Sequence, residues 1–169
     1  MSKKPIQCMV AVAKNGIIGS NGGLPWASIG GIPEDFEWFK SNTKGGVIIW
    51  GSKCHCEFGS LPDTGIVVLT RDRSKTFSGA PETAYDLEDA ISKARTMLSY
   101  PGPIWICGGE AIYAEAISLC DKVYITHVHQ NFDGDKKFPS DWQRHFSKLT
   151  YSRDSSHGEI KFTFEIWEK

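Results

Sequence analysis

The sequence predicts a single α/β domain, spanning residues 1–169, that is built around one largely parallel sheet. Two observations predict this class. Short runs rich in β-branched residues alternate with segments of helical periodicity, which is typical of βα units around a parallel sheet. The length of 169 residues also suits one domain, because a chain of this size buries roughly two-thirds of its unfolded surface in one core.

Eight runs along the chain are expected to form strands. They are Gln7–Ala13, Gly46–Trp50, Ile66–Thr70, Thr83–Tyr85, Ile104–Cys107, Lys122–Val128, Lys148–Ser152 and Lys161–Trp167. Helices are expected at Pro33–Thr43, Ser52–Phe58, Leu87–Ser99 and Glu110–Leu119. Pro33 suits a first helical turn, and Asp86 suits the cap of the third helix. The last two runs predict a terminal hairpin with a long loop over residues 154–158.

The charge of the chain argues for a small-molecule ligand. Nineteen basic and twenty acidic residues give a formal net charge of -1 and are spread without blocks. No electrostatic argument therefore favours nucleic acid or a membrane surface. The first apolar run ends at Ala13 and is too short for a signal peptide or a membrane span. We expect a soluble, cytoplasmic monomer.

The cysteines and histidines predict neither a disulfide framework nor a metal centre. The five cysteines are odd in number and irregularly spaced, at Cys8, Cys54, Cys56, Cys107 and Cys120. This pattern indicates reduced thiols. Cys54-His55-Cys56 offers soft ligands, and His127 and His129 share one strand face. Neither group has a second pair at the spacing of a metal-binding finger, so we expect no bound metal.

Asp35 is the most informative polar residue of the sequence. In a helix over Pro33–Thr43 it lies four residues before Phe39 and next to Phe36, so the acid points where the rings point. A carboxylate among buried rings is costly unless it is paired or used in chemistry. The alternative is that Glu34 and Asp35 are first-turn acids that the helix dipole favours.

A second candidate block is Cys107-Gly108-Gly109-Glu110, which follows a predicted strand and opens a predicted helix. Backbone amides at such a position can face an anion. The block lacks the full G-x-G-x-x-G fingerprint of dinucleotide-binding proteins. A tight βα turn that needs flexible residues is therefore the alternative interpretation.

Together with further blocks, these motifs resemble the dihydrofolate reductase family. The blocks follow the family's order: Gly16-Ile17-Ile18-Gly19, Leu24-Pro25-Trp26, the helix with Asp35, Gly108-Gly109, Tyr124-Ile125-Thr126-His127 and Phe132-Asp133-Gly134-Asp135. The resemblance covers essentially the whole chain. It implies a mostly parallel eight-stranded sheet flanked by four helices, with a C-terminal hairpin. It also implies a cis peptide bond in the Gly108-Gly109 turn, which is rare outside proline.

The resemblance further implies an enzyme that uses NADPH to reduce 7,8-dihydrofolate to 5,6,7,8-tetrahydrofolate. The implied catalytic residues are Asp35, which assists protonation of the pterin, Thr126 and Trp26. The implied substrate residues are Met9, Val10, Ala11, Asp35, Phe36, Phe39, Lys40, Leu61, Cys107, Tyr113 and Thr126. The implied cofactor residues are Ala13, Ile18, Gly19, Gly51, Ser52, Lys53, Cys54, Leu69, Thr70, Arg71, Cys107, Gly108, Gly109, Glu110, Ala111, Ile112 and Tyr113.

Arg71 is the residue implied to bind the 2′-phosphate of NADPH. Leu69-Thr70-Arg71 resembles the family's strand-end pair, and the forked donors of arginine suit a phosphate. Lys53 would add positive charge, although Ser52 and Cys54 stand where the family usually has a base and a hydroxyl. Without the resemblance, Arg71 belongs to a solvated surface turn.

Two departures from the family concern the substrate. Eight residues, Ala27–Glu34, separate Trp26 from Asp35, which is longer than the family's link. The segment Leu61–Gly65 lacks the arginine that binds the substrate's glutamate carboxylate in the family, and Lys40 is the candidate substitute. Two alternatives stay open: a reductase of this fold acting on another pterin or on a riboflavin-pathway pyrimidine, and a non-catalytic pterin- or nucleotide-binding relative.

Overall fold

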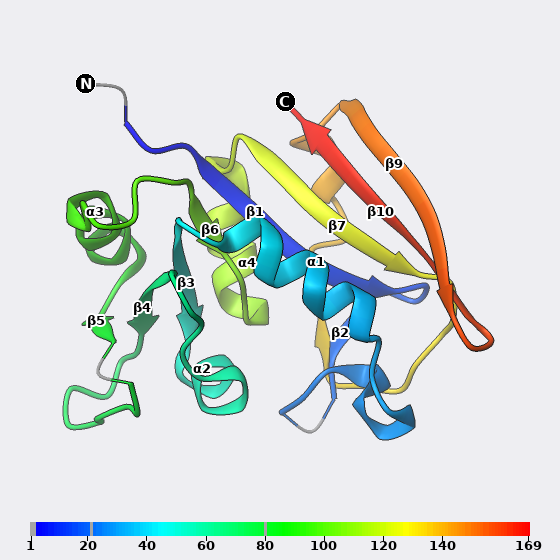
Figure 1. Ribbon diagram of the computed structural model, residues 1–169, viewed down its shortest axis with the longest axis horizontal. Coiled ribbons are helices and arrows are strands. Elements are labelled where there is room, and N and C mark those ends of the chain that lie inside the picture. The colour runs from blue at the N-terminus through cyan, green and yellow to red at the C-terminus, as the bar shows by residue number, and fades with distance from the viewer. Residues whose placement is uncertain (1–2, 21, 80) are drawn as a thin grey trace.

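The computed structural model describes residues 3–20, 22–79 and 81–169. Its centre is an eight-stranded sheet in the order β5-β4-β3-β6-β1-β7-β10-β9 (Figure 1). The strands are β1 (Ile6–Ala13), β3 (Val47–Gly51), β4 (Gly65–Leu69), β5 (Glu82–Ala84), β6 (Ile104–Ile106), β7 (Lys122–Val128), β9 (Lys148–His157) and β10 (Ile160–Glu168). Neighbours from β5 to β7 are parallel, whereas β10 runs antiparallel to β7 and β9. The predicted fold class is confirmed.

Helices cover both faces of this sheet. They are α1 (Pro33–Thr43), α2 (Ser52–Phe58), α3 (Leu87–Thr96) and α4 (Glu110–Ala116), with short 3-10 helices η1 (Pro25–Ile29), η2 (Ile117–Leu119) and η3 (Trp142–Arg144). Figure 1 shows α1 crossing one face in front of β1, with α4 behind the sheet. Accordingly, α3 and α4 pack into the larger core cluster, whereas Trp38 and Phe39 of α1 pack on the opposite face. In the part of the chain that is described, no helix is long and apolar enough to cross a membrane.

The third helix is shorter than predicted. It ends at Thr96 rather than Ser99. The ammonium group of Lys4 donates hydrogen bonds of 2.8 and 3.0 Å to the carbonyl oxygens of Ala94 and Met97. A distant side chain therefore adds a second donor to two carbonyls at the end of the helix, and local sequence gives no sign of it.

The terminal hairpin also differs from the prediction. β9 continues to His157, and only Gly158 and Glu159 separate it from β10. Gly158 has a φ of 60°, a left-handed conformation that suits a two-residue hairpin turn. The polar residues 154–157, expected in the loop, instead form part of an exposed edge strand. Their lack of alternation concealed it.

A second, two-stranded sheet was not predicted. It consists of β2 (Ile17–Gly19) and β8 (Lys136–Lys137), which are antiparallel. Strands of two or three residues are too short to show hydrophobic periodicity. This small sheet joins the segment that follows β1 to the segment that follows β7.

Candidate active site

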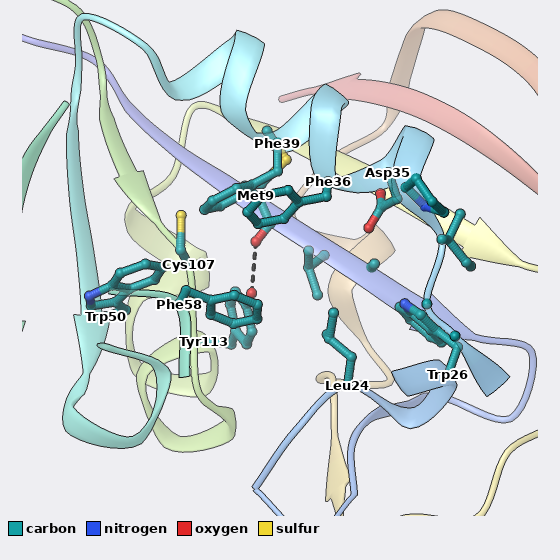
Figure 2. A pocket seen from close by; sticks show the side chains of 16 residues that line it. Met9, Leu24, Trp26, Asp35, Phe36, Phe39, Trp50, Phe58, Cys107 and Tyr113 are labelled. Atoms are coloured by element: carbon teal, nitrogen blue, oxygen red, sulfur yellow. Dashed lines mark hydrogen bonds between the residues drawn. The ribbon is translucent and has the colours of Figure 1, made fainter. Parts of the chain in front are cut away.

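An apolar cavity of about 300 Å³ opens beside α1, at the carboxyl ends of central strands (Figure 2). Asp35 is the one acidic side chain among the described residues that line it. Of the residues implied for substrate or catalysis, those in its wall are Met9, Val10, Ala11, Trp26, Asp35, Phe36, Phe39, Cys107 and Tyr113. The cavity is therefore a pocket with aromatic walls and a single carboxyl group.

Asp35 is fixed at this wall by a hydrogen bond to the sheet. Its Oδ1 accepts a hydrogen bond of 2.7 Å from the hydroxyl of Thr126 in β7. Burial raises the pKa of Asp35 to about 6, and the hydrogen bond from Thr126 opposes that shift. A carboxyl group with this pKa changes its protonation close to neutral pH, as a group that assists proton transfer must.

The start of α1 determines where this carboxyl group points. Pro33 opens the helix, and the carbonyl of buried Ile32 accepts from the backbone N–H groups of Asp35 and Phe36 at 3.1 and 3.3 Å. Phe36 and Phe39 stack with their ring centroids 6.1 Å apart. Figure 2 shows Asp35 and both rings directed into the pocket. The acid therefore lies with the rings, as the helical spacing predicts.

The terminal hairpin supports the same turn of α1. Arg153 of β9 donates a hydrogen bond of 2.8 Å to one carboxylate oxygen of Glu34, and the Ser155 hydroxyl donates one of 2.5 Å to the other. These hydrogen bonds, Ser155 first, lower the pKa of Glu34. One helical turn on, the Trp38 ring stacks on Phe164 of β10 at 4.5 Å.

Three residues implied for the substrate do not line the cavity. Thr126 is buried and supports Asp35 from the sheet. The side chain of Leu61 packs against the core cluster under α1. Lys40 forms an ion pair of 2.7 Å with Glu37 and lies over the Phe36 ring, because i, i+3 neighbours meet on the helix surface. None of these three side chains is therefore among the residues that line the cavity.

The wall also contains residues that sequence reasoning missed, namely Leu24, Gly30, Gly31, Ile32, Pro33, Trp50 and Phe58. Gly30 and Gly31 have φ values of 96° and 77°, and a side chain at either position would meet nothing within 4 Å. The long link before Asp35 was the signal for this part of the rim. Phe58 stacks on Phe36 and Trp50 at 6.3 and 5.8 Å, and no local pattern pointed to it.

Tyr113 connects the floor of the pocket to β1. Its hydroxyl donates a hydrogen bond of 2.7 Å to the carbonyl oxygen of Met9 (Figure 2). Burial raises the pKa of Tyr113 well above its usual value, so the hydroxyl stays neutral and remains a donor.

A second cavity, of about 560 Å³, adjoins the first and shares several of its residues. Of the residues implied for the cofactor, it is lined by Ile18, Gly19, Gly51, Ser52, Lys53, Cys54, Leu69, Thr70, Arg71, Cys107, Gly108, Gly109, Glu110, Ala111, Ile112 and Tyr113. Ala13 is the exception, because it is buried in the core cluster that contains Ile17 and Trp26. This cofactor cleft extends along the ends of β3, β4 and β6.

Two glycines form the backbone at the middle of the cleft: Gly108 packs closely against its neighbours, and Gly109 faces open space. The Gly108–Gly109 peptide bond is cis, as the resemblance implies. Gly108 has a φ of 116°, and a Cβ there would lie 3.3 Å from Sγ of Cys54. At Gly109 a Cβ would meet nothing within 4 Å, so bare backbone borders open cleft. Burial, and then the charge of Glu57, raise the pKa of Cys54 to about 11, so this thiol is protonated.

Within the Cys54-His55-Cys56 group, the His55 ring is held by contacts inside the protein. His55 is buried, its Nδ1 lies 3.3 Å from the indole nitrogen of Trp50, and its Nε2 lies 2.9 Å from the carbonyl oxygen of Ser78. Both ring nitrogens therefore have protein partners. His127 lies 2.8 Å from Glu165, and His129 lies 2.7 Å from the Thr163 hydroxyl. Outside residues 1, 2, 21 and 80, no group of three or more potential ligands is positioned to hold a metal ion.

The fold and the two joined cavities define a single-domain α/β protein with an extended site at the carboxyl ends of its parallel strands. A family model described as "Dihydrofolate reductase" matches residues 5–169. The chain belongs to the dihydrofolate reductase family. This membership confirms the predicted family and the prediction of an NADPH-dependent oxidoreductase.

Individual relatives agree with this assignment. Dihydrofolate reductase of Staphylococcus haemolyticus is 34% identical over 143 residues, 82% of this chain and 81% of that protein. Dihydrofolate reductase of Buchnera aphidicola is 31% identical, with coverage of 97% and 98%. Among solved structures, dihydrofolate reductase from Enterococcus faecalis, complexed with NADP(H) and RAB-propyl, aligns with a TM-score of 0.84 and 25% identity over 97% of this chain and 95% of that one.

Proposed function

We propose that this protein reduces 7,8-dihydrofolate to 5,6,7,8-tetrahydrofolate with NADPH. The observation that carries the proposal is the Asp35–Thr126 pair in the wall of an apolar pocket that opens into the cofactor cleft. A pterin presents a flat ring with an amino-pyrimidine edge. The aromatic walls suit the ring, and a single carboxyl group suits the edge.

The cofactor cleft offers NADPH basic side chains and open backbone, although acidic side chains also line it. Lys53 and Arg71 line it, and neither forms an ion pair in the part of the chain that is described. The bare backbone at Gly109 leaves room for a ring against the protein. Arg71 would hold the 2′-phosphate and Lys53 would add charge, while Gly51 and Thr70 shape the wall between them. When bound, NADPH supplies the hydride.

The residues of the chain would orient the pterin and control its protonation. Asp35 would accept two hydrogen bonds from the amino-pyrimidine edge and favour the protonated pterin. Thr126 would keep the carboxyl group in place. Phe36, Phe39 and Trp26 would exclude water, so that the charge of Asp35 acts in a medium of low polarity. Tyr113 would hold the floor of the pocket through its hydrogen bond to Met9.

One observation favours a second candidate, a reductase of this fold that acts on another pterin or on a riboflavin-pathway pyrimidine. The buried hydroxyl of Thr64 bonds to the Pro62 carbonyl at 3.0 Å, and no arginine occupies the segment Leu61–Gly65. The substrate's anionic tail would then matter little.

Loss of NADPH absorbance, measured with and without dihydrofolate, tests the proposal. We expect oxidation that requires dihydrofolate and yields tetrahydrofolate in equal amount. Oxidation that occurs only with another pterin, or with a ribosylamino-pyrimidine, would identify the second candidate. Binding of dihydrofolate and NADPH without turnover would identify a non-catalytic relative.

A further inference from the structure

The side chain of Glu110 forms a link across the cofactor cleft. Glu110 is the first residue of α4, and its Oε2 accepts a hydrogen bond of 2.7 Å from the backbone N–H of Lys137 in β8. Glu110 itself lines the cleft. A carboxylate that accepts from a backbone N–H forms a charge-assisted hydrogen bond, which is stronger than a neutral one. One exposed side chain therefore ties the cofactor helix to a separate strand.

That strand is in turn tied to the segment after β1. Lys137 pairs with Ile17, and the backbone N–H of Asp135 donates a hydrogen bond of 3.0 Å to the carbonyl oxygen of Gly19. The two segments pack without a gap, because a Cβ on Gly134 would collide with Gly19 and Ile17. Movement of β8 therefore carries β2 with it.

β2 leads directly into a wall of the site. Ile18, Gly19, Gly22, Gly23 and Leu24 line the cofactor cleft, and Leu24 also lines the substrate pocket. We call the residues 17–20 and 22–24 the β2 wall. A continuous series of contacts thus runs from Glu110 through β8 to the β2 wall.

We propose that Glu110 is a positioning residue that holds the β2 wall against the cofactor cleft. Its carboxylate performs this role at the expense of cofactor affinity, because it places a negative charge where the anionic phosphates of NADPH approach. The second half of this inference rests on the proposed function. The first half concerns the protein alone and is tested without any ligand.

The contrasting interpretation is that Glu110 only stabilises α4, since an acid is favoured in the first turn of a helix. Such a role would affect α4 and overall stability, and it would leave β2 unchanged. Three variants separate the two interpretations. Glu110→Ala removes the acceptor and the charge, and Glu110→Gln removes the charge but keeps an acceptor oxygen. Glu115→Ala removes another acid that lines the cleft from the same helix, one turn further on.

Hydrogen–deuterium exchange of the ligand-free proteins tests the link. We expect Glu110→Ala to accelerate exchange in peptides from residues 14–20 and 135–138 by roughly fivefold or more, as the loss of a charge-assisted hydrogen bond implies. Glu115→Ala should exchange there like the wild type, and Glu110→Gln, whose neutral amide oxygen is a weaker acceptor, should lie between the wild type and Glu110→Ala. Unchanged exchange in Glu110→Ala, or equal acceleration in Glu115→Ala, would overturn the proposal. Melting temperatures of all variants establish that each is folded.

Equilibrium binding of NADPH tests the effect of the charge. Glu110→Gln should bind NADPH about two- to fivefold more tightly than the wild type, the range expected for one exposed charge, and the gain should vanish at about 1 M salt. Unchanged or weaker binding by Glu110→Gln would refute the claim that the charge of Glu110 lowers the affinity for NADPH. If the wild type does not bind NADPH at all, the proposed function fails, and the exchange experiment still decides the link.

Discussion

The hydroxyl of Thr126 donates a hydrogen bond of 2.7 Å to Oδ1 of Asp35, which lies 91 residues earlier in the chain. Thr126 is 1% exposed and stands in the middle of the sheet, where it pairs with Ala11 on one side and Phe164 on the other. The helical acid is therefore held by a buried residue of the central sheet. Because burial and this hydrogen bond act on the pKa of Asp35 in opposite directions, each can be tested separately.

Replacement of Asp35 by asparagine should abolish most of the reductase activity. Asparagine keeps the shape and an acceptor for Thr126 but cannot exchange a proton, so we expect the rate to fall by on the order of a hundredfold or more. The rate of the wild type should also fall as pH rises through about 6, the pKa of Asp35. Steady-state and single-turnover rates between pH 5 and pH 9 measure both effects. Near-normal turnover by Asp35→Asn at neutral pH would show that the acid is not needed.

Replacement of Thr126 by valine should move the pH profile upward. The hydroxyl lowers the pKa of Asp35, so its removal lets burial raise that pKa further above 6. A hydrogen bond to a charged group is worth about 1.5–3 kcal/mol, which corresponds to a shift of about one unit or more. Thr126→Ser retains the hydroxyl and is the matched control. A profile for Thr126→Val that coincides with that of Thr126→Ser would contradict this account.

Asp35→Asn should also make the protein more stable at neutral pH. The pKa of Asp35 is raised from 3.8 to about 6 in the fold, so the folded state binds more protons than the unfolded state between those values. Stability is therefore lost as pH rises from about 4 to about 6, and the cost is complete above that window. The cost is about 2–3 kcal/mol. Urea unfolding should show this gain for Asp35→Asn at pH 7.5 and its disappearance near pH 4.

Arg71→Ala should reduce the preference for NADPH over NADH. Arg71 lines the cofactor cleft next to Thr70, and its forked donors suit a dianionic phosphate that NADH lacks. Binding of NADPH should weaken by about 1.5–3 kcal/mol, while binding of NADH stays nearly unchanged. Arg73→Ala is the control, because the Arg73 side chain lies over the Tyr85 ring at 4.2 Å. Equal losses for the two cofactors would place the phosphate elsewhere.

The glutamate tail of dihydrofolate should contribute little to catalysis. Lys40 is paired with Glu37, and Lys44 lies 3.8 Å from Asp63, so neither lysine near the pocket rim is free of an acid. We expect dihydrofolate and dihydropteroate, which lacks the glutamate, to differ only a few-fold in kcat/KM. Loss of a bidentate charged pair would instead cost about 2 kcal/mol, roughly thirtyfold. If the wild type discriminates to that extent and Lys40→Met does not, Lys40 binds the tail.

The parallel core of the fold was predictable because its strands are buried on both sides. Runs such as Val47–Gly51 and Lys122–Val128 are rich in β-branched residues, and their positions agree with the prediction within one residue. β2 and β8 were missed because three and two residues give no periodic signal. The second half of β9 was missed because its polar residues show no hydrophobic alternation and β9 is the edge strand of the sheet.

The residues of the candidate site were predictable where a residue of that type is unusual in its local setting. A carboxylate on an aromatic helix face and a Gly-Gly turn after a strand are such cases, and both border the cavities. Lys40 and Leu61 lie outside the cavity lining because spacing along the chain does not fix which way a side chain turns, and their contact with substrate stays a prediction. Glu110 was expected at the cofactor cleft, but its hydrogen bond to Lys137, like the stacking of Phe58 on Phe36, joins segments distant in sequence that no local pattern encodes.

The hydrogen bonds from the terminal hairpin to Glu34 of α1 affect the order in which the site is completed during synthesis. Ser155 bonds to Glu34 across 121 residues, so the turn that carries Asp35 leaves the ribosome long before the strands that hold it. At about 5–20 residues per second, the delay is roughly 6–24 s. Late in that interval the nascent chain has the acid and the residues of its pocket but not the two strands that brace its turn. We therefore expect activity to appear late, once β9 and β10 have added to the edge of β7.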